Sequence, residues 1–289
     1  MINLFSNNSL LFTYNQFGGF CMEKNFRTWG APPYHTITIH GGPGAAGELA
    51  RFSKILSQDF SCVELLQTKF SVDDEIQEIY DMITKYADDL VVLIGHSWGA
   101  LISLLFSARN LEAVKKLILV GCPPLVERYV QNVQDTRWDR ISMDQLPKIK
   151  DIEFRMDDSD PQIQNQAFFE FGKFYETIDS FSLDPTLQIE DPSILRYSYE
   201  IANKIWLNFI PIRRSGQLLE EISKIKSELV FIHGEFDPHP IEGIEKPLQS
   251  INKPYTLHIL KECGHSPWVE HYAYQQFYEI LKKELNSIK

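Results

Sequence analysis

The chain has 289 residues, of which 44% are hydrophobic and 23% charged, and its net charge is −11. This composition is ordinary for a globular enzyme built as one domain with a sizeable insertion. The acidic balance without a basic cluster argues against nucleic acid or an anionic membrane surface as partner. The sequence shows no signal peptide and no membrane span, so we expect a cytoplasmic protein. The four widely spaced cysteines, Cys21, Cys62, Cys122 and Cys263, are expected to be buried free thiols.

The first 124 residues alternate between predicted strands and helices. A short antiparallel strand pair is expected at residues 8–29, bent at Gly18 and Gly19, before the remaining elements follow in order. These are a strand at 35–40 ending in the loop GGPGAAG, a helix at 48–56, a strand at 61–66, a helix at 72–86, a strand at 90–94, a helix from Trp98 and a strand at 114–121.

The alternation stops at Leu125 and resumes after about Arg213. The residues between are helical in pattern, polar and rich in aromatic side chains, as in AFFEFGKFYETIDSF. A helix at 215–225, a strand at 228–233, a helix at 242–250, a strand at 255–260 and a helix at 271–287 then complete the chain. Strands that alternate with helices indicate a mostly parallel sheet covered on both faces. We therefore predict an α/β core from residues 1–124 and 214–289, with a helical cap inserted at 125–213.

The stretch LVVLIGHSWGALISLLFSA, residues 90–108, is a buried strand that turns into a helix at Ser97. Such a sharp turn strains the backbone of its central residue, and Gly95 and Gly99 provide the space in which strand and helix pass. This geometry exposes the Ser97 hydroxyl and directs the Trp98 amide, at a helix N-terminus, toward developing negative charge. Ser97 is therefore the predicted nucleophile.

A serine nucleophile needs a base and a group that orients the base. Open parallel sheets bind their ligands at the carboxyl ends of the strands. Two predicted strands are followed there by residues that could be the base and the orienting acid. GEFDPHP follows one strand and brings Glu235 and Asp237; KECGHSPW follows the next and brings His265. We predict that His265 is the general base and that Asp237 fixes its tautomer. Glu235 is the competing acid, since glutamate can fill the same role.

The loop His40-Gly41-Gly42-Pro43-Gly44 follows another strand. Its glycines allow the backbone to approach a ligand, so we predict that the amides of Gly42 and Trp98 form an oxyanion hole, with Gly41 the weaker candidate. The loop histidine is expected to be structural, and His96 is expected to point away from the site. The histidines lack metal-ligand spacing, so neither a metal nor a cofactor is predicted.

The motifs HGGPG, GHSWG, GEFD and GHSPW together resemble the α/β-hydrolase superfamily, and among its members most resemble the proline iminopeptidases. The resemblance implies an α/β-hydrolase fold, with a mostly parallel eight-stranded sheet flanked by helices and an inserted helical cap. It implies the order Ser97, Asp237, His265 for a catalytic triad. It also implies acidic cap residues that bind the free amine of the substrate, for which Glu170 and Glu200 are the best-placed candidates.

The leading hypothesis is a cofactor-free serine hydrolase that acts through an acyl-enzyme on a small molecule or short peptide with an ester or amide bond. Its most specific form is proline iminopeptidase-like aminopeptidase activity. The Asp-x-Arg-Gly run of that family is replaced here by ELLQTKFSV, so a carboxylesterase or carbon–carbon bond hydrolase stays open. A lyase, a cofactor-free haloperoxidase and a non-catalytic ligand-binding protein of the same fold are further alternatives. The sequence does not indicate an oligomeric state.

Overall fold

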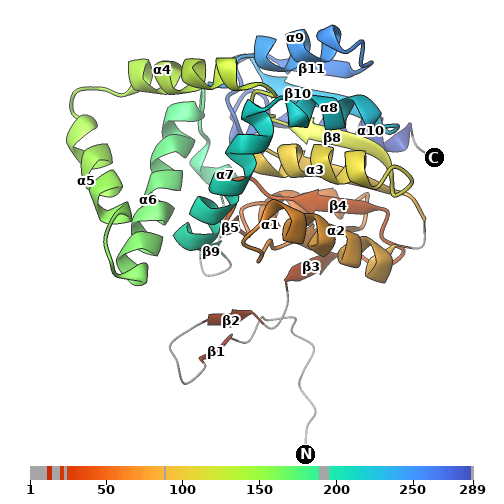
Figure 1. The fold of residues 1–289 in the computed structure, drawn as a ribbon, viewed down its shortest axis with the longest axis horizontal. Helices are drawn as coiled ribbons and strands as arrows, with labels where there is room; N and C mark the ends of the chain where they lie inside the picture. Colours follow the sequence, from red (N-terminus) through yellow and green to blue (C-terminus); the bar gives the residue numbers. More distant parts are fainter. Residues whose placement is uncertain (1–11, 15–19, 23–24, 88, 189–194, 288–289) are drawn as a thin grey trace, which may run out of the picture.

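The computed structural model describes residues 12–14, 20–22, 25–87, 89–188 and 195–287 (Figure 1). Its main sheet has seven strands in the order β11-β10-β8-β7-β4-β6-β3, and β3 alone runs antiparallel to its neighbour. The strands are β3 (Phe26–Trp29), β4 (Thr36–Ile39), β6 (Cys62–Leu65), β7 (Val91–His96), β8 (Val114–Val120), β10 (Glu228–Gly234) and β11 (Thr256–Leu260).

Both faces of this sheet are buried, because its central strands are continuous apolar runs whose side chains alternate between two cores. In β7, Leu93 packs in the core under one set of helices and Ile94 in the core under the other. The first set comprises α2 (Val72–Tyr86), α3 (Trp98–Arg109), α8 (Gln217–Lys224) and α9 (Glu242–Ser250). The second comprises α1 (Ala50–Leu56) and α10 (Tyr274–Asn286). This confirms the predicted α/β-hydrolase architecture of a mostly parallel sheet flanked by helices.

The expected count of eight strands in one sheet is wrong for the described residues, in which the main sheet has seven. Near the N-terminus β1 (Phe12–Tyr14) and β2 (Phe20–Met22) pair with each other in a separate antiparallel sheet. The predicted bend at Gly18 and Gly19 lies outside the described residues. The third strand of that region, β3, pairs instead with β6 at the edge of the main sheet.

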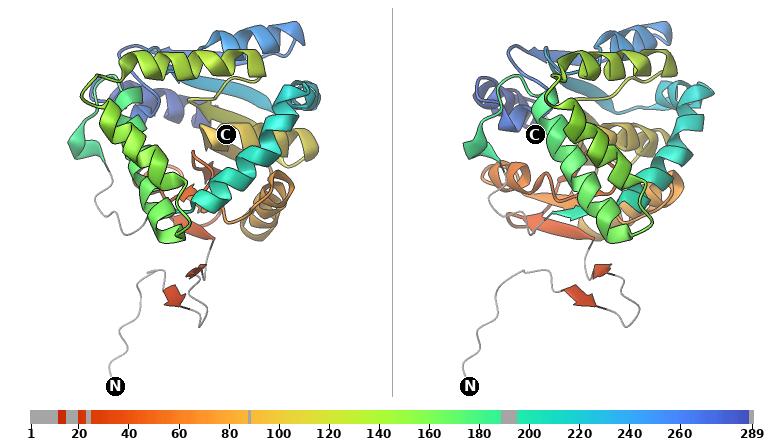
Figure 2. Two further views of the ribbon diagram at one scale, coloured as in Figure 1. Left: turned by 60° about the vertical axis from the view of Figure 1, so that its left-hand side comes forward. Right: turned by 90° about the vertical axis from the view of Figure 1, so that its left-hand side faces the viewer.

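The segment at 125–213 is helical, and Figures 1 and 2 show its green helices grouped to one side of the sheet. Four of its residues, Ile149, Ile152, Phe174 and Ile178, form a small core of their own. The elements are η1 (Glu127–Tyr129), α4 (Val130–Arg140), α5 (Leu146–Met156), α6 (Pro161–Asp179), η2 (Pro185–Leu187), β9 (Arg196–Tyr197) and α7 (Tyr199–Arg214).

A two-strand sheet joins this helical segment to the glycine loop. β5 (Ala45–Ala46) pairs with β9, and the Ser198 N–H donates to the carbonyl oxygen of Gly44 over 2.8 Å. Gly44 has φ +78°, and a side chain there would collide with the Ser198 carbonyl oxygen, so glycine is required. Among the described helices, none is long and apolar enough to cross a bilayer.

Candidate active site

Ser97 stands at the turn between β7 and α3 with φ +51° and ψ −114°, a strained conformation for a residue with a side chain. A side chain at Gly95 would collide with the carbonyl oxygen of Gly99, and one at Gly99 with that of Ile39. The two glycines therefore permit the close crossing of strand and helix that the sequence predicts. Ser97 lines a cavity of about 480 Å³ that also includes Gly42 and His265.

Asp237 and His265 meet at the carboxyl ends of β10 and β11. The Nδ1 atom of His265 lies 2.8 Å from Oδ2 of Asp237, which is buried. Glu235, the competing acid, is exposed, and its backbone N–H donates to the carbonyl oxygen of Leu260. The structure thus brings Asp237, and not Glu235, to the predicted histidine.

The electrostatics of this pair follow from burial and from neighbouring imidazoles. Burial by itself would raise the pKa of Asp237, yet the adjacent His265, His239 and His233 hold the pKa of this carboxyl well below its usual range. Burial lowers the pKa of His265 to about 4, although the charge of Asp237 and its hydrogen bond act in the opposite direction. At neutral pH the pair therefore consists of a carboxylate and a neutral imidazole.

His239 is a cavity residue that the sequence analysis missed. Oδ1 of Asp237 accepts its backbone N–H over 2.9 Å and lies 2.7 Å from its Nδ1. The available signal was the spacing Asp-Pro-His, in which an aspartate bonds to the residue two positions later. Asp237, His239 and His265 also have donor spacing compatible with a metal ion, and the hydrogen bonds among them account for that closeness.

The glycine loop after β4 is held by the buried His40 and by the partly exposed Glu48. His40 has Nδ1 2.7 Å from the carbonyl oxygen of Gly41 and accepts the N–H of Gln67 at Nε2, which is the structural role expected of it. The Gly41 N–H donates to Oε1 of Glu48 over 2.5 Å. Because this amide is already engaged, Gly42, which lines the cavity, is the better placed of the two candidates for the predicted oxyanion hole. Trp98 begins α3, where backbone N–H groups have no partner within the helix.

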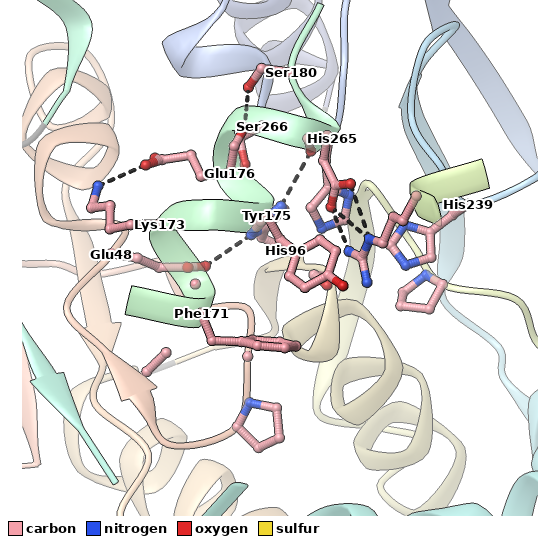
Figure 3. A pocket seen from close by; sticks show the side chains of 18 of the residues that line it. Glu48, His96, Phe171, Lys173, Tyr175, Glu176, Ser180, His239, His265 and Ser266 are labelled. Carbon is pink, nitrogen blue, oxygen red and sulfur yellow. Dashed lines mark hydrogen bonds and ion pairs between the residues drawn. The ribbon is translucent and has the colours of Figure 1, made fainter. Parts of the chain in front are cut away.

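The expectation that His96 points away from the site is wrong. Its side chain lines the cavity, with Nδ1 2.9 Å from Oε1 of Glu48 and Nε2 3.3 Å from the carbonyl oxygen of His265 (Figure 3). Side chains two positions apart in a strand lie on the same face of the sheet, so His96 is on the face of Ile94. This face is directed toward Trp268, and the ring centroids of His96 and Trp268 are 4.6 Å apart. Burial would raise the pKa of Glu48, but the hydrogen bond from His96 lowers it to about 2.

The helical segment contributes aromatic and charged side chains to the cavity wall. The carboxylates Glu176 and Asp179 of α6 line it; Glu176 pairs with Lys173, and Asp179 with Arg137. The aromatic lining residues are Phe168, Phe171, Tyr175, Tyr197, Trp206 and Trp268.

The two acidic residues suggested from the sequence lie elsewhere. Glu170 pairs with Arg155, and Glu200 is exposed and pairs with Lys204 over 2.7 Å; neither lines the cavity. Helical phase explains the error for Glu170, because the residues of α6 that line the cavity recur at 168, 171–173, 175–176 and 179.

The profile of the alpha/beta hydrolase family matches residues 37–277 of this chain. The protein belongs to the alpha/beta hydrolase family. This alpha/beta hydrolase is 21% identical over 258 residues to a 2-hydroxy-6-oxo-2,4-heptadienoate hydrolase of Pseudomonas putida, covering 81% of this chain and 82% of the relative. It is also 21% identical over 268 residues to a proline iminopeptidase of Heyndrickxia coagulans, covering 87% and 90%.

Solved structures share the fold of this alpha/beta hydrolase. The crystal structure of VinJ superposes with a TM-score of 0.64 at 16% sequence identity, covering 91% of this chain and 95% of VinJ. At that identity the likeness concerns the fold. The family and its hydrolase relatives support a hydrolase, and the reaction it catalyses must be argued from the cavity itself.

Proposed function

We propose that this protein is a serine hydrolase that cleaves a small ester or amide through an acyl-enzyme. Ser97 is the nucleophile, His265 the general base and Asp237 the residue that orients it, while the amides of Gly42 and Trp98 stabilise the oxyanion. One observation carries the proposal: the hydrogen-bonded pair of Asp237 and His265 opens onto the same cavity as the strained Ser97.

The reaction proceeds in two balanced halves. Ser97 Oγ forms a bond to the carbonyl carbon as its proton passes to Nε2 of His265; the bond to the leaving group then breaks, and that group takes the proton. Water next gives its proton to His265 and attacks the acyl carbon, and Ser97 regains its proton as the acid leaves. Each oxyanion donor is worth about 3 kcal/mol in the transition state.

Residues 125–213 form the proposed cap, inserted into the core of residues 1–124 and 214–289. Its own small core and its contribution to the cavity wall support this division. A small molecule or short peptide is the proposed substrate, in keeping with the cavity volume of about 480 Å³.

The described cysteines Cys62, Cys122 and Cys263 are free, which supports a reducing compartment such as the cytoplasm.

Pre-steady-state kinetics with a chromogenic acetate ester test the proposal. An acyl-enzyme produces a burst of about one equivalent of the coloured alcohol per protein before slower turnover. A protein that binds the ester without releasing the alcohol would instead fit the alternative of a non-catalytic ligand-binding protein.

Because the pKa of His265 is low, we predict that kcat/KM falls only at a pH lower than is usual for a histidine base. The base works only when neutral, so kcat/KM is lost as pH falls through the pKa of His265 in the free enzyme, which is about 4. We expect kcat/KM to stay level from pH 8 through 6.5 and to fall by about tenfold per pH unit only well below 6. Initial rates on a neutral ester, with circular dichroism to confirm folding, provide the measurement; a limb centred near pH 6.5 would contradict the lowered pKa of His265.

The aminopeptidase form of the proposal rests on Glu176, the cavity carboxylate of the cap that has the simpler pairing. Asp179 accepts a fork of hydrogen bonds from Arg137, whereas the Glu176 carboxylate accepts a hydrogen bond from the partly exposed Lys173. A substrate ammonium can replace that lysine. We expect proline or alanine anilides with a free amine to be cleaved much faster than their N-acetyl forms.

Glu176→Gln should raise KM for the free-amine anilide by about tenfold, the loss of about 1.4 kcal/mol, and leave an ester substrate unaffected. Glu170→Gln, on the same helix but outside the cavity, is the matched control. Equal rates on free and acetylated anilides, or activity confined to esters, would favour the carboxylesterase or carbon–carbon bond hydrolase.

A further inference from the structure

The carboxylate of Asp237 receives hydrogen bonds from two imidazoles. Oδ2 lies 2.8 Å from Nδ1 of His265, and Oδ1 lies 2.7 Å from Nδ1 of His239. The two rings lie side by side with centroids 4.7 Å apart, and both residues line the cavity (Figure 3). The buried carboxylate of Asp237 is therefore bonded to two histidines, His265 and His239. The proposed reaction uses only the pair with His265.

The proton positions in the second pair follow from the chemistry of the groups. An ionised carboxylate only accepts hydrogen bonds, so Nδ1 of His239 must carry the proton that it shares with Oδ1. Burial lowers the pKa of His239, against the effect of the neighbouring Asp237, and the ring remains neutral. His239 is therefore a fixed Nδ1–H donor to the carboxylate at the pH of the reaction.

The backbone of His239 is itself anchored. Its carbonyl oxygen accepts a hydrogen bond from Nε2 of His233 over 2.8 Å, and its N–H makes the second bond to Oδ1 of Asp237. His233 is a buried residue of β10, a strand of the main sheet. Oδ1 is thus tied through His239 to a rigid strand, and rotation of the carboxylate away from His265 would break two hydrogen bonds.

We propose that His239 is a positioning residue: it fixes the Asp237 carboxylate so that Oδ2 stays on Nδ1 of His265. This inference rests on the proposed function, because it concerns the orientation of the proposed base. His239 acts through Asp237 and does not take part in proton transfer to or from Ser97.

Two substitutions at His239 separate the Nδ1–H donor from the rest of the ring. His239→Ala removes the donor and should lower kcat by about 30-fold with KM nearly unchanged. In His239→Asn the side-chain amide nitrogen stands where Nδ1 stood, and kcat should recover to within about threefold of the wild type. His271→Ala is the matched control, because His271 makes the same kind of contact, Nδ1 to Asp184 over 3.1 Å, on the exposed surface.

Proton NMR of the Ser97→Ala protein detects the hydrogen bonds of Asp237 with His265 and His239 without any turnover. The protein should show two low-field imidazole N–H resonances bonded to Asp237. His239→Ala should remove one and displace the other, and His239→Asn should leave the His265 resonance near its wild-type position. The assignment of the His265 signal comes from its loss in His265→Ala.

Three results would overturn the inference: an unchanged kcat in His239→Ala, an Asn variant as impaired as the Ala variant, or an effect confined to KM. If the alanine variant does not fold, the kcat of the asparagine variant and the two NMR resonances still test the positioning role of His239. A protein whose Ser97 is not needed for hydrolysis would refute the proposed function. A Ser97→Ala protein in which neither His239→Ala nor His239→Asn removes a low-field resonance would refute the role of His239.

Discussion

Ser97→Ala is expected to lower kcat by roughly six orders of magnitude and to abolish labelling by a fluorophosphonate probe. The strained turn places the Ser97 hydroxyl at the cavity that His265, bonded to the buried Asp237, also lines, and without that oxygen no acyl-enzyme forms. Ser180→Ala, which changes a second serine of the same cavity, should leave both activity and labelling intact. Steady-state rates and peptide mapping of the labelled protein provide the measurement; labelling that survives Ser97→Ala would contradict the assignment.

His265→Ala should be about as damaging as loss of the serine, because the members of a triad act as a unit. For the same reason the double variant with Ser97→Ala should be hardly slower than either single variant. Additive losses in the double variant would show that His265 acts independently of Ser97.

Asp237→Asn is expected to lower kcat by roughly 10⁴ while the protein remains folded. An amide in place of the carboxylate can present its nitrogen to His265 and favour the tautomer whose proton is on Nε2, the atom that must accept the proton of Ser97. The matched change Glu235→Gln, two residues earlier on the same loop, should have little effect because Glu235 is exposed. Measured kcat values for the two variants decide between the acids, and the reverse order would transfer the orienting role to Glu235.

The elements best predicted from sequence are those whose signal is local. The helix predicted at residues 72–86 is observed as α2 with the same bounds, because Ser71 accepts the N–H of Asp74 and so defines its first turn. β7 and β8 are readable because strands buried on both faces are continuous apolar runs. The pairing of β5 with β9 was not predicted, since it joins two-residue strands about 150 positions apart and depends on the folded arrangement of the helical segment.

The candidate site divides in the same way. Ser97 and Asp237 carry signals in their own neighbourhoods: a pair of glycines in one case and a strand end in the other. The contributions of Glu48 and His96 depend on which face of a strand or helix lines the cavity. A sequence motif alone does not contain that information. Glu170 shows the resulting error, because a position one residue along a helix turns a side chain by about 100°.

Because β5 pairs with β9, movement of the proposed cap is coupled to the glycine loop. On one side Ser198 is bonded to Gly44, two residues from Gly42; on the other the carbonyl oxygen of Asp179 accepts the N–H of His265 over 3.0 Å. Lifting the cap would pull at once on the loop that carries the proposed oxyanion donor and on the loop that carries the proposed base. An enzyme held open would therefore lose the geometry of the proposed oxyanion hole and of the proposed base together.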